Sequence, residues 1–241
     1  MTYTEVLSNT LTIEQIRGST ATTTDALLLA AFLRRTDGTA LELGAGSGIV
    51  SILAATRGRF ARAELCERIP ELAALCRRNI ERAALKDRLT VIEADLRTLA
   101  PPARYLSVFA NPPYRRANEG RPPQDPLLDA ARFERAGGIR DFCEAAARLL
   151  LPEGSLSLVF PCGRRDELLA TLLAAGFFPE EEVTVYPYPG GRAKLLLLRA
   201  ARHGGQPSRH RLTLATEAGT PTEAAEALYR DGILLTEGDP T

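Results

Sequence analysis

Four consecutive residues, Asn111-Pro112-Pro113-Tyr114, carry groups that can hold a planar ligand. The run before them, residues 105–109, is short, aromatic and β-branched, which predicts a buried strand. Two successive prolines lack an N–H and have a fixed φ, so the strand has to end at Asn111. An amide, carbonyl groups and an aromatic ring are therefore left at the carboxyl end of a strand. In an open α/β sheet, ligands bind at this edge.

These groups suit an amino group whose lone pair is delocalised into a ring. The side-chain oxygen of Asn111 and the carbonyl of Pro112 can each accept one N–H, which favours a pyramidal nitrogen and stabilises positive charge as it develops. Tyr114 offers a face on which a base can stack. A strand-ending turn that only happens to carry an aromatic residue is the alternative, because Asn-Pro is itself a turn signal.

A glycine loop lies upstream, between a strand at residues 40–43 and a helical pattern from residue 49. Gly44, Gly46 and Gly48 would let the backbone approach a ligand that faces the helix N-terminus. Their G-x-G-x-G spacing differs from the G-x-G-x-x-G that favours dinucleotides. A tight turn that needs glycine for steric reasons alone is the other interpretation.

Three acidic residues are further candidates. Glu67 follows a strand at residues 62–66 and lies about 20 residues beyond the loop, the interval expected for a carboxylate that holds a ribose diol. Asp95, with Leu96, follows a third strand and is placed to accept a hydrogen bond from an adenine amino group. Asp25 precedes an apolar helical run. Each acid also has a structural explanation as a helix cap or first-turn charge.

The composition is that of an ordinary globular protein, and it disfavours several classes of protein and of binding site. The 241 residues have a formal net charge of zero, so no global field draws the protein to nucleic acid or to a membrane surface. The two histidines are late in the chain, and the four cysteines lack C-x-x-C spacing, so we expect reduced core cysteines and no metal site. No signal peptide is recognisable and the apolar runs are too short to span a bilayer, which predicts a cytoplasmic protein without membrane contact.

Strands and helices alternate along most of the chain, which predicts an α/β fold. We expect one domain over residues 1–241, with a cap and lead helix at 1–38, a Rossmann-like core at 39–200 and a C-terminal extension at 201–241. The strands at residues 182–186 and 194–199 are close in sequence and should form an antiparallel pair at one sheet edge.

The order of glycine loop, acid, Asp and Asn-Pro-Pro-Tyr (the NPPY motif) resembles the Rossmann-like S-adenosylmethionine-dependent methyltransferases that modify an exocyclic or amide nitrogen. Residues 24–30, 41–48 and 111–114 are similar to the bacterial tRNA (adenine-N6) methyltransferase family that acts on valine tRNA. Residues 192–202 and 220–223 also fit the tail of that family. The resemblance implies a class I fold with a mostly parallel seven-stranded sheet, helices on both faces and an antiparallel edge strand.

The resemblance also implies S-adenosylmethionine as cofactor and tRNA, with an unpaired target adenine, as substrate. The cofactor residues that it implies are Asp25, Glu42, Gly44, Gly46, Gly48, Glu67, Asp95, Leu96 and Asn111. The residues implied at the target nitrogen are Asn111, Pro112, Pro113 and Tyr114, and those implied for RNA binding are Tyr114, Arg115 and Arg116. Glu42 departs from the family pattern, in which many relatives have Asp, but the longer carboxylate can still reach a bound methionine.

Methyl transfer of this kind requires alignment of the nucleophile, the methyl group and the sulfur. It does not require a histidine or cysteine base, because the proton on the target nitrogen becomes acidic only after methylation. A glutamine side-chain amide in a protein, or another RNA base amino group, would suit the same acceptor pair. Two other functions are possible on this fold: a cofactor-binding scaffold without turnover and a nicotinamide dehydrogenase. The NPPY motif disfavours the first, and the glycine spacing disfavours the second.

The basic cluster from Arg199 to Arg211 is a candidate phosphate contact or a solvated loop. Monomer and homodimer both stay open.

Overall fold

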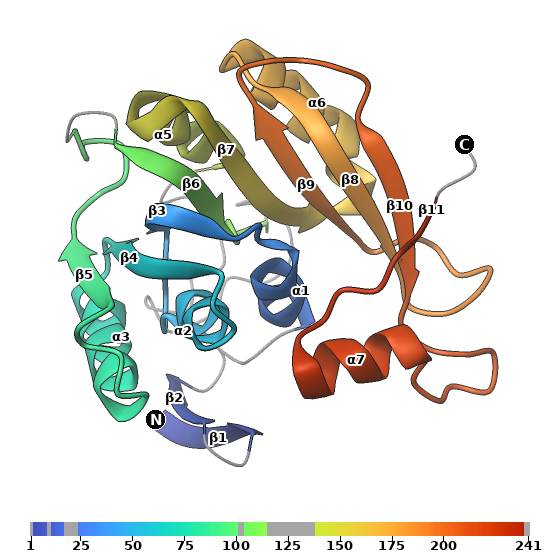
Figure 1. Ribbon diagram of the computed structural model, residues 1–241, viewed down its shortest axis with the longest axis horizontal. Coiled ribbons are helices and arrows are strands. Elements are labelled where there is room, and N and C mark those ends of the chain that lie inside the picture. Colours follow the sequence, from blue (N-terminus) through green and yellow to red (C-terminus); the bar gives the residue numbers. More distant parts are fainter. Residues whose placement is uncertain (1, 9–10, 17–23, 101–103, 115–137, 239–241) are drawn as a thin grey trace, which may run out of the picture.

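A mixed β-sheet is the centre of the molecule, and helices cover both of its faces (Figure 1). The computed structural model describes residues 2–8, 11–16, 24–100, 104–114 and 138–238. Its strands are β1 (Thr2–Ser8), β2 (Leu11–Ile16), β3 (Thr36–Leu43), β4 (Phe60–Glu67), β5 (Leu89–Glu93), β6 (Tyr105–Ala110), β7 (Leu150–Pro161), β8 (Phe178–Tyr186), β9 (Leu195–Ala201), β10 (Ser208–Thr213) and β11 (Glu237–Gly238). Its helices are α1 (Thr24–Phe32), α2 (Ile49–Thr56), α3 (Pro70–Arg82), α5 (Ile139–Leu149), α6 (Arg165–Ala174) and α7 (Glu223–Asp231), and a single 3₁₀ turn, η2 (Cys162–Arg164), follows β7.

Among the described residues the main sheet has nine strands in the order β11-β10-β8-β9-β7-β6-β3-β4-β5. The run from β7 to β5 is parallel throughout. Strand β9 pairs antiparallel with both β7 and β8, and β10 pairs parallel with β8. Because the carboxyl ends of parallel strands meet at one edge, the loops after β3, β4, β5, β6 and β7 lie together there.

The predicted α/β class, with a mostly parallel sheet and helices on both faces, is confirmed, as is the antiparallel pairing of β8 with β9. Two details differ from the expectation. The antiparallel strand β9 lies between β7 and β8 instead of at the edge, since the short connection at residues 187–194 cannot make a parallel crossover and returns β9 beside β8. The sheet is also wider than seven strands, because the C-terminal segment adds β10 and β11.

Two apolar layers hold the helices to the sheet. Helices α1, α2, α3 and α7 pack on one face, and α5 and α6 pack on the other (Figure 1). The sequence of α3 shows why: Pro70 is favoured in the first turn, and the apolar side chains of Leu72, Leu75 and Ile80 share one buried face. Cys66, Cys76 and Cys143 are buried free thiols, as predicted.

A hydrogen-bonded asparagine joins the hairpin of β1 and β2 to the rest of the fold. The buried Asn79 side chain in α3 accepts from the backbone N–H of Glu14 at 2.8 Å and donates to the Glu14 carbonyl at 2.9 Å. It also donates to the carbonyl of Ser47 in the glycine loop at 3.0 Å. One side chain thus connects the hairpin, α3 and the loop.

Arg199, expected in a surface basic cluster, lies in the core of the sheet on β9. Its side chain is 2% exposed, pairs with Glu181, donates to the carbonyl of Phe32 at 2.7 Å and lies over the Phe32 ring. A cation suits the C-terminal end of α1, where the carbonyls lack partners. The phosphate-binding alternative for Arg199 is therefore wrong, because the strand pairing buries this residue.

Candidate active site at the carboxyl edge of the sheet

The structure brings Asp25, Asn111 and Tyr114 together, although they come from α1 and from the loop after β6. The Tyr114 hydroxyl donates to Oδ2 of Asp25 at 2.6 Å and is also in hydrogen-bond contact with Oδ1 of Asn111. Asp25 is in the first turn of α1, where its charge also suits the helix dipole. Its helix-terminal position and its contact with the NPPY motif therefore coexist.

Phe160, near the end of β7, and Arg164, in the turn η2 that follows, support Tyr114 from the other side. The ring packs edge-to-face against Phe160, with centroids 6.1 Å apart. The Arg164 guanidinium donates to the Tyr114 carbonyl at 2.8 Å and lies over the Phe160 ring. Burial, followed by the charge of Asp25, raises the pKa of the Tyr114 phenol well above its ordinary value. The phenol therefore stays protonated near neutral pH and acts as a hydrogen-bond donor.

The two prolines lie between Asn111, which directly follows β6, and Tyr114. Pro112 is buried, and Pro113 and Asn111 are partly exposed. Within the part of the chain that the structure describes, the Pro112 carbonyl accepts no hydrogen bond. A carbonyl has two lone pairs, so this group keeps its capacity to accept an N–H of a ligand.

The glycine loop has the backbone conformation that its sequence requires. Gly44, Gly46 and Gly48 have φ values of 69°, 56° and 79°, a region that other residues rarely adopt. A Cβ at Gly48 would lie 2.6 Å from Sγ of Cys76, whereas a Cβ at Gly46 would have no atom within 4 Å. Gly48 is thus needed for packing, and Gly46 borders open space.

Glu67, at the end of β4, is joined to this loop. Its carboxylate accepts from the backbone N–H groups of Gly46 and Ile69, each at 2.8 Å. Burial outweighs these hydrogen bonds and raises the pKa of the Glu67 carboxyl. A carboxylate offers about four acceptor positions, so two remain for hydroxyl groups such as a ribose diol. The geometry fits the predicted cofactor contact.

Glu42, in β3, contacts the first turn of α2, the helix that directly follows the glycine loop. Its side chain is 2% exposed and accepts from the backbone N–H and the hydroxyl of Ser51. Burial raises the pKa of the Glu42 carboxyl to about 8. The negative charge of Glu67 also raises the pKa of Glu42, so the two carboxyl groups interact. The cofactor contact of Glu42 stays a prediction.

Asp95 and Leu96 follow β5, and the strands β3 and β4 lie between β5 and β6, the strand that precedes the NPPY motif. The Asp95 carboxylate is paired with Arg97 at 2.5 Å, which lowers the pKa of the Asp95 carboxyl. Leu96 packs on the apolar layer under α5. An adenine amino group would share the Asp95 carboxylate with Arg97.

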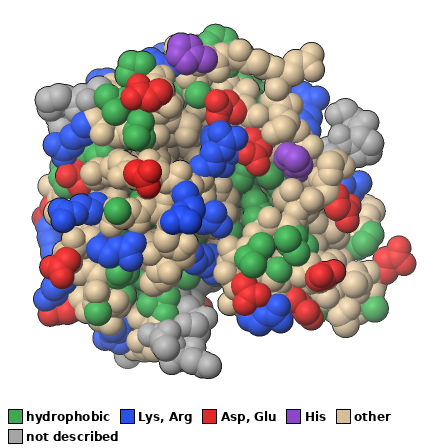
Figure 2. All heavy atoms as spheres, in the orientation of Figure 1, with side chains coloured by type: hydrophobic (Ala, Val, Ile, Leu, Met, Phe, Trp, Pro, Cys, Tyr) green, Lys and Arg blue, Asp and Glu red, His purple; other side chains and the backbone are tan. Residues whose placement is uncertain are grey.

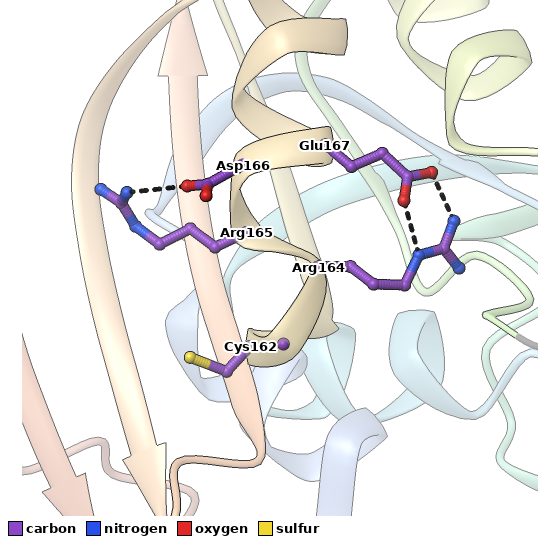
Figure 3. Close-up of a pocket in the computed structure, with 6 residues that line it drawn as sticks. Cys162, Arg164, Arg165, Asp166 and Glu167 are labelled. Atoms are coloured by element: carbon purple, nitrogen blue, oxygen red, sulfur yellow. Dashed lines mark hydrogen bonds and ion pairs between the residues drawn. The ribbon is translucent and has the colours of Figure 1, made fainter.

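Sequence reasoning missed Phe160 and Arg164, which contact Tyr114, and Asn79, which donates to the Ser47 carbonyl in the glycine loop. Only the strand order places the end of β7 beside the end of β6, and no local spacing signals it. A cavity of about 430 Å³ next to these residues is lined by residues 162–167. Figure 3 shows the Arg164–Glu167 pair on one side of the start of α6 and the Arg165–Asp166 pair on the other. Arg115 and Arg116 lie outside the described residues.

The strand order, with the glycine loop and the NPPY motif at one edge, defines a Rossmann-like class I methyltransferase. In fold, the chain is similar to a protein from Agrobacterium tumefaciens described as a predicted O-methyltransferase, with a TM-score of 0.70 and 23% identity over 88% of this chain and 98% of that chain. Residues 20–168 match the model of the methyltransferase small domain family. The chain belongs to this family.

Curated relatives point to the same family. The chain is 31% identical over 214 residues to a tRNA1(Val) (adenine(37)-N6)-methyltransferase of Shewanella amazonensis, a match that covers 88% of this chain and 91% of that protein. It is 32% identical to the enzyme of the same name from Aeromonas hydrophila, over 74% of this chain and 75% of that protein. The predicted class, a methyltransferase, is confirmed, and membership of the family supports S-adenosylmethionine as the cofactor. Across the described ranges, none of the helices is long and apolar enough to cross a membrane.

Proposed function

We propose that this methyltransferase methylates N6 of an unpaired adenine in tRNA, and that its substrate is adenine 37 of valine tRNA, as the names of its relatives state for those proteins. The observation that carries the proposal is the hydrogen-bonded group of Asp25, Tyr114 and Asn111 beside the open carbonyl of Pro112. This arrangement presents two acceptors to a planar amino group at the edge of the sheet where ligands bind.

The glycine loop and Glu67 would hold the cofactor. S-adenosylmethionine, when bound, supplies a methyl group on a positively charged sulfur. Glu67 is held by two backbone N–H groups, so its remaining lone pairs have a fixed direction for the ribose hydroxyls. Gly46 leaves space for the ligand next to this carboxylate. We assign adenine recognition to Asp95 and Leu96 and keep Glu42 as a proposed contact on the methionine side.

Asn111 and Pro112 would activate the target nitrogen. Oδ1 of Asn111 has two lone pairs, so it can accept an N–H of the target while it contacts Tyr114. The Pro112 carbonyl accepts the second N–H, which turns the nitrogen lone pair out of the ring plane and stabilises the developing charge. Pro113 lacks an N–H and has a fixed φ, so it would help to hold the Pro112 carbonyl in place.

No side chain of the site has to act as a base before methyl transfer. The raised pKa of Tyr114 keeps its phenol neutral, and burial raises the pKa of the Cys66 thiol to about 12. The methylated nitrogen is strongly acidic, so its proton passes to water or to the carboxylate of Asp25 through the Tyr114 hydroxyl.

The test is transfer of labelled methyl from S-adenosylmethionine to an unmodified valine tRNA transcript, followed by nucleoside analysis. We expect labelled N6-methyladenosine, and replacement of adenine 37 in the transcript should abolish it. Label in a protein glutamine instead of RNA would overturn the RNA assignment.

Two variants test the roles of the site residues. Asn111→Ala should lower kcat by about 100-fold or more, the effect of removing one preorganised hydrogen-bonding group, with cofactor affinity unchanged. Glu67→Gln should mainly weaken cofactor binding, which calorimetry measures, and should affect kcat less. A parallel loss of cofactor binding in Asn111→Ala would show that the assigned role is wrong.

A further inference from the structure

Strand β8 leads into a short loop, residues 187–194, that carries exposed cations close to the site. Arg192 and Lys194 are both exposed. The backbone N–H of Cys162 donates to the Lys194 carbonyl at 2.9 Å, which attaches the loop to the turn after β7. This loop is therefore held at the carboxyl edge of the sheet, near the NPPY motif.

A continuous series of contacts leads from the motif to the loop. Arg164 donates to the Tyr114 carbonyl at 2.8 Å, and Gly163 precedes Arg164 in the chain. The Arg192 Nη2 atom lies 3.7 Å from the position that a Cβ would take at Gly163. The Arg192 guanidinium thus lies close to Gly163, and the next residue, Arg164, contacts Tyr114 directly.

The charge of this loop is not balanced by carboxylates. Arg164 is paired with Glu167, and Arg165 with Glu182, so these two cations are compensated. Arg192 and Lys194 form no ion pair among the described residues. On the face seen in Figure 2, basic and acidic side chains are otherwise mixed, which agrees with the zero net charge. Binding of a polyanion by this protein must therefore depend on such local cations.

Tyr188 adds an aromatic face to the same loop. The backbone N–H of Gly191 donates to the Tyr188 carbonyl at 3.1 Å, and Gly190 has a φ of 70°, which describes a turn with Pro189 and glycine at their preferred positions. A Cβ at Gly191 would lie 2.9 Å from the Tyr188 ring, so the ring rests against its own turn. The side chain is still 54% exposed and keeps a face available for stacking.

We propose that Tyr188, Arg192 and Lys194 form a binding surface for the single-stranded RNA next to the target adenine. Arg192 and Lys194 bind phosphates, and Tyr188 stacks a neighbouring base. Uncompensated cations beside a preformed aromatic platform are the features by which proteins hold single-stranded nucleic acid. The inference rests on the proposed function and assigns how an RNA is held by a chain without net positive charge.

The test measures binding of the unmodified valine tRNA transcript by fluorescence anisotropy over a series of salt concentrations. The double variant Arg192→Ala/Lys194→Ala should weaken binding and reduce the slope of log K against log salt by about 1.4, or about 0.7 for each single-strand phosphate contact. Tyr188→Ala should weaken binding by about tenfold and leave the slope unchanged, and Tyr188→Phe should restore it. Arg62→Ala is the matched control, because Arg62 is an exposed cation near the amino end of β4.

The outcomes distinguish failure of the binding surface from failure of the proposed function. If the wild-type protein methylates the transcript but the double variant keeps its affinity and salt slope, the binding surface is wrong and the proposed function stands. If the double variant and Arg62→Ala lose affinity equally, the effect is one of general charge, and the surface is again refuted. If the wild-type protein neither binds nor methylates the transcript, both proposals fail. Calorimetric titration with S-adenosylmethionine should give the same affinity for every variant, which verifies that each is folded.

Discussion

At the scale of single residues, the Tyr114 hydroxyl connects two groups but has only one proton. It lies between the Asp25 carboxylate and the Asn111 carboxamide. A carboxylate is the stronger acceptor, so the proton is held mainly toward Asp25. We infer that Asp25 positions Tyr114, and that Tyr114 in turn limits the rotation of the Asn111 side chain.

Removal of the Tyr114 hydroxyl or of the Asp25 charge should slow the same step, methyl transfer. Tyr114→Phe keeps the ring against Phe160, and Asp25→Asn keeps the size of the side chain. Each should lower kcat by about tenfold to 100-fold, within the range of groups that assist proton transfer or orientation, with little change in KM for the cofactor. Steady-state kinetics with the tRNA transcript measures both constants.

The double variant decides whether the two residues act as one unit. If they do, Asp25→Asn/Tyr114→Phe should be no slower than the worse single variant, since residues in one network are not additive. Multiplied losses would mean that Asp25 acts independently of Tyr114, as expected of a cofactor contact or a helix charge.

At the scale of elements, a buried carboxyl group joins β3 to α2. Glu42 accepts from the backbone N–H and hydroxyl of Ser51, and its pKa is raised to about 8 from 4.5. Between these two values the folded chain binds one proton more than the unfolded chain. The free energy of unfolding therefore falls as pH rises through this window, and the effect ends above the folded pKa.

Glu42→Gln should remove this pH dependence. The carboxamide oxygen can still accept from Ser51, and no proton is released. The difference in free energy of unfolding between Glu42→Gln and wild type should shift in favour of the variant by up to about 1.4 kcal/mol per pH unit across the window. Urea denaturation at a series of pH values measures it, with Glu71→Gln as a control for the loss of an exposed carboxylate. A constant difference would show that Glu42 is ionised in the folded protein at all these pH values.

At the scale of the whole molecule, segments distant in sequence are tied to the site edge. Asn79 joins the N-terminal hairpin to α3 and to the glycine loop through Glu14 and Ser47. At the other end of the chain, β10 pairs with β8 in the main sheet. We infer that the segments predicted as cap and extension form one domain with the core.

Asn79→Ala should loosen the hairpin and the loop together. The substitution leaves buried backbone groups without partners, at a cost of about 1–3 kcal/mol for each such group, and should also weaken cofactor binding. Arg78→Ala is the matched control, because it removes only the half-exposed ion pair with Glu14 and should cost no more than about 1 kcal/mol. Chemical denaturation and calorimetry provide the two readouts. Equal losses in the two variants would argue that the ion pair, and not Asn79, holds the hairpin.

Much of the site could be anticipated because its signals are local. Consecutive prolines end a strand wherever they occur, and glycines with positive φ mark a turn without reference to the rest of the chain. The contact between Asp25 and Tyr114 is of another kind, since 89 residues separate them. Arg199 shows the limit most clearly: in sequence it belongs to a basic run, but pairing of β9 between two strands buries it.

The sequence by itself determined where the strands end, which turns need glycine and proline, and which polar groups follow each strand, because backbone sterics act over a few residues. Only the tertiary structure decided that the ends of β6 and β7 are neighbours and that Arg164 and Phe160 support Tyr114. It also decided that the loop with Tyr188 and Arg192 lies at the same edge. Strand order and helix packing depend on apolar surfaces buried between distant segments, and no local pattern specifies which segments meet.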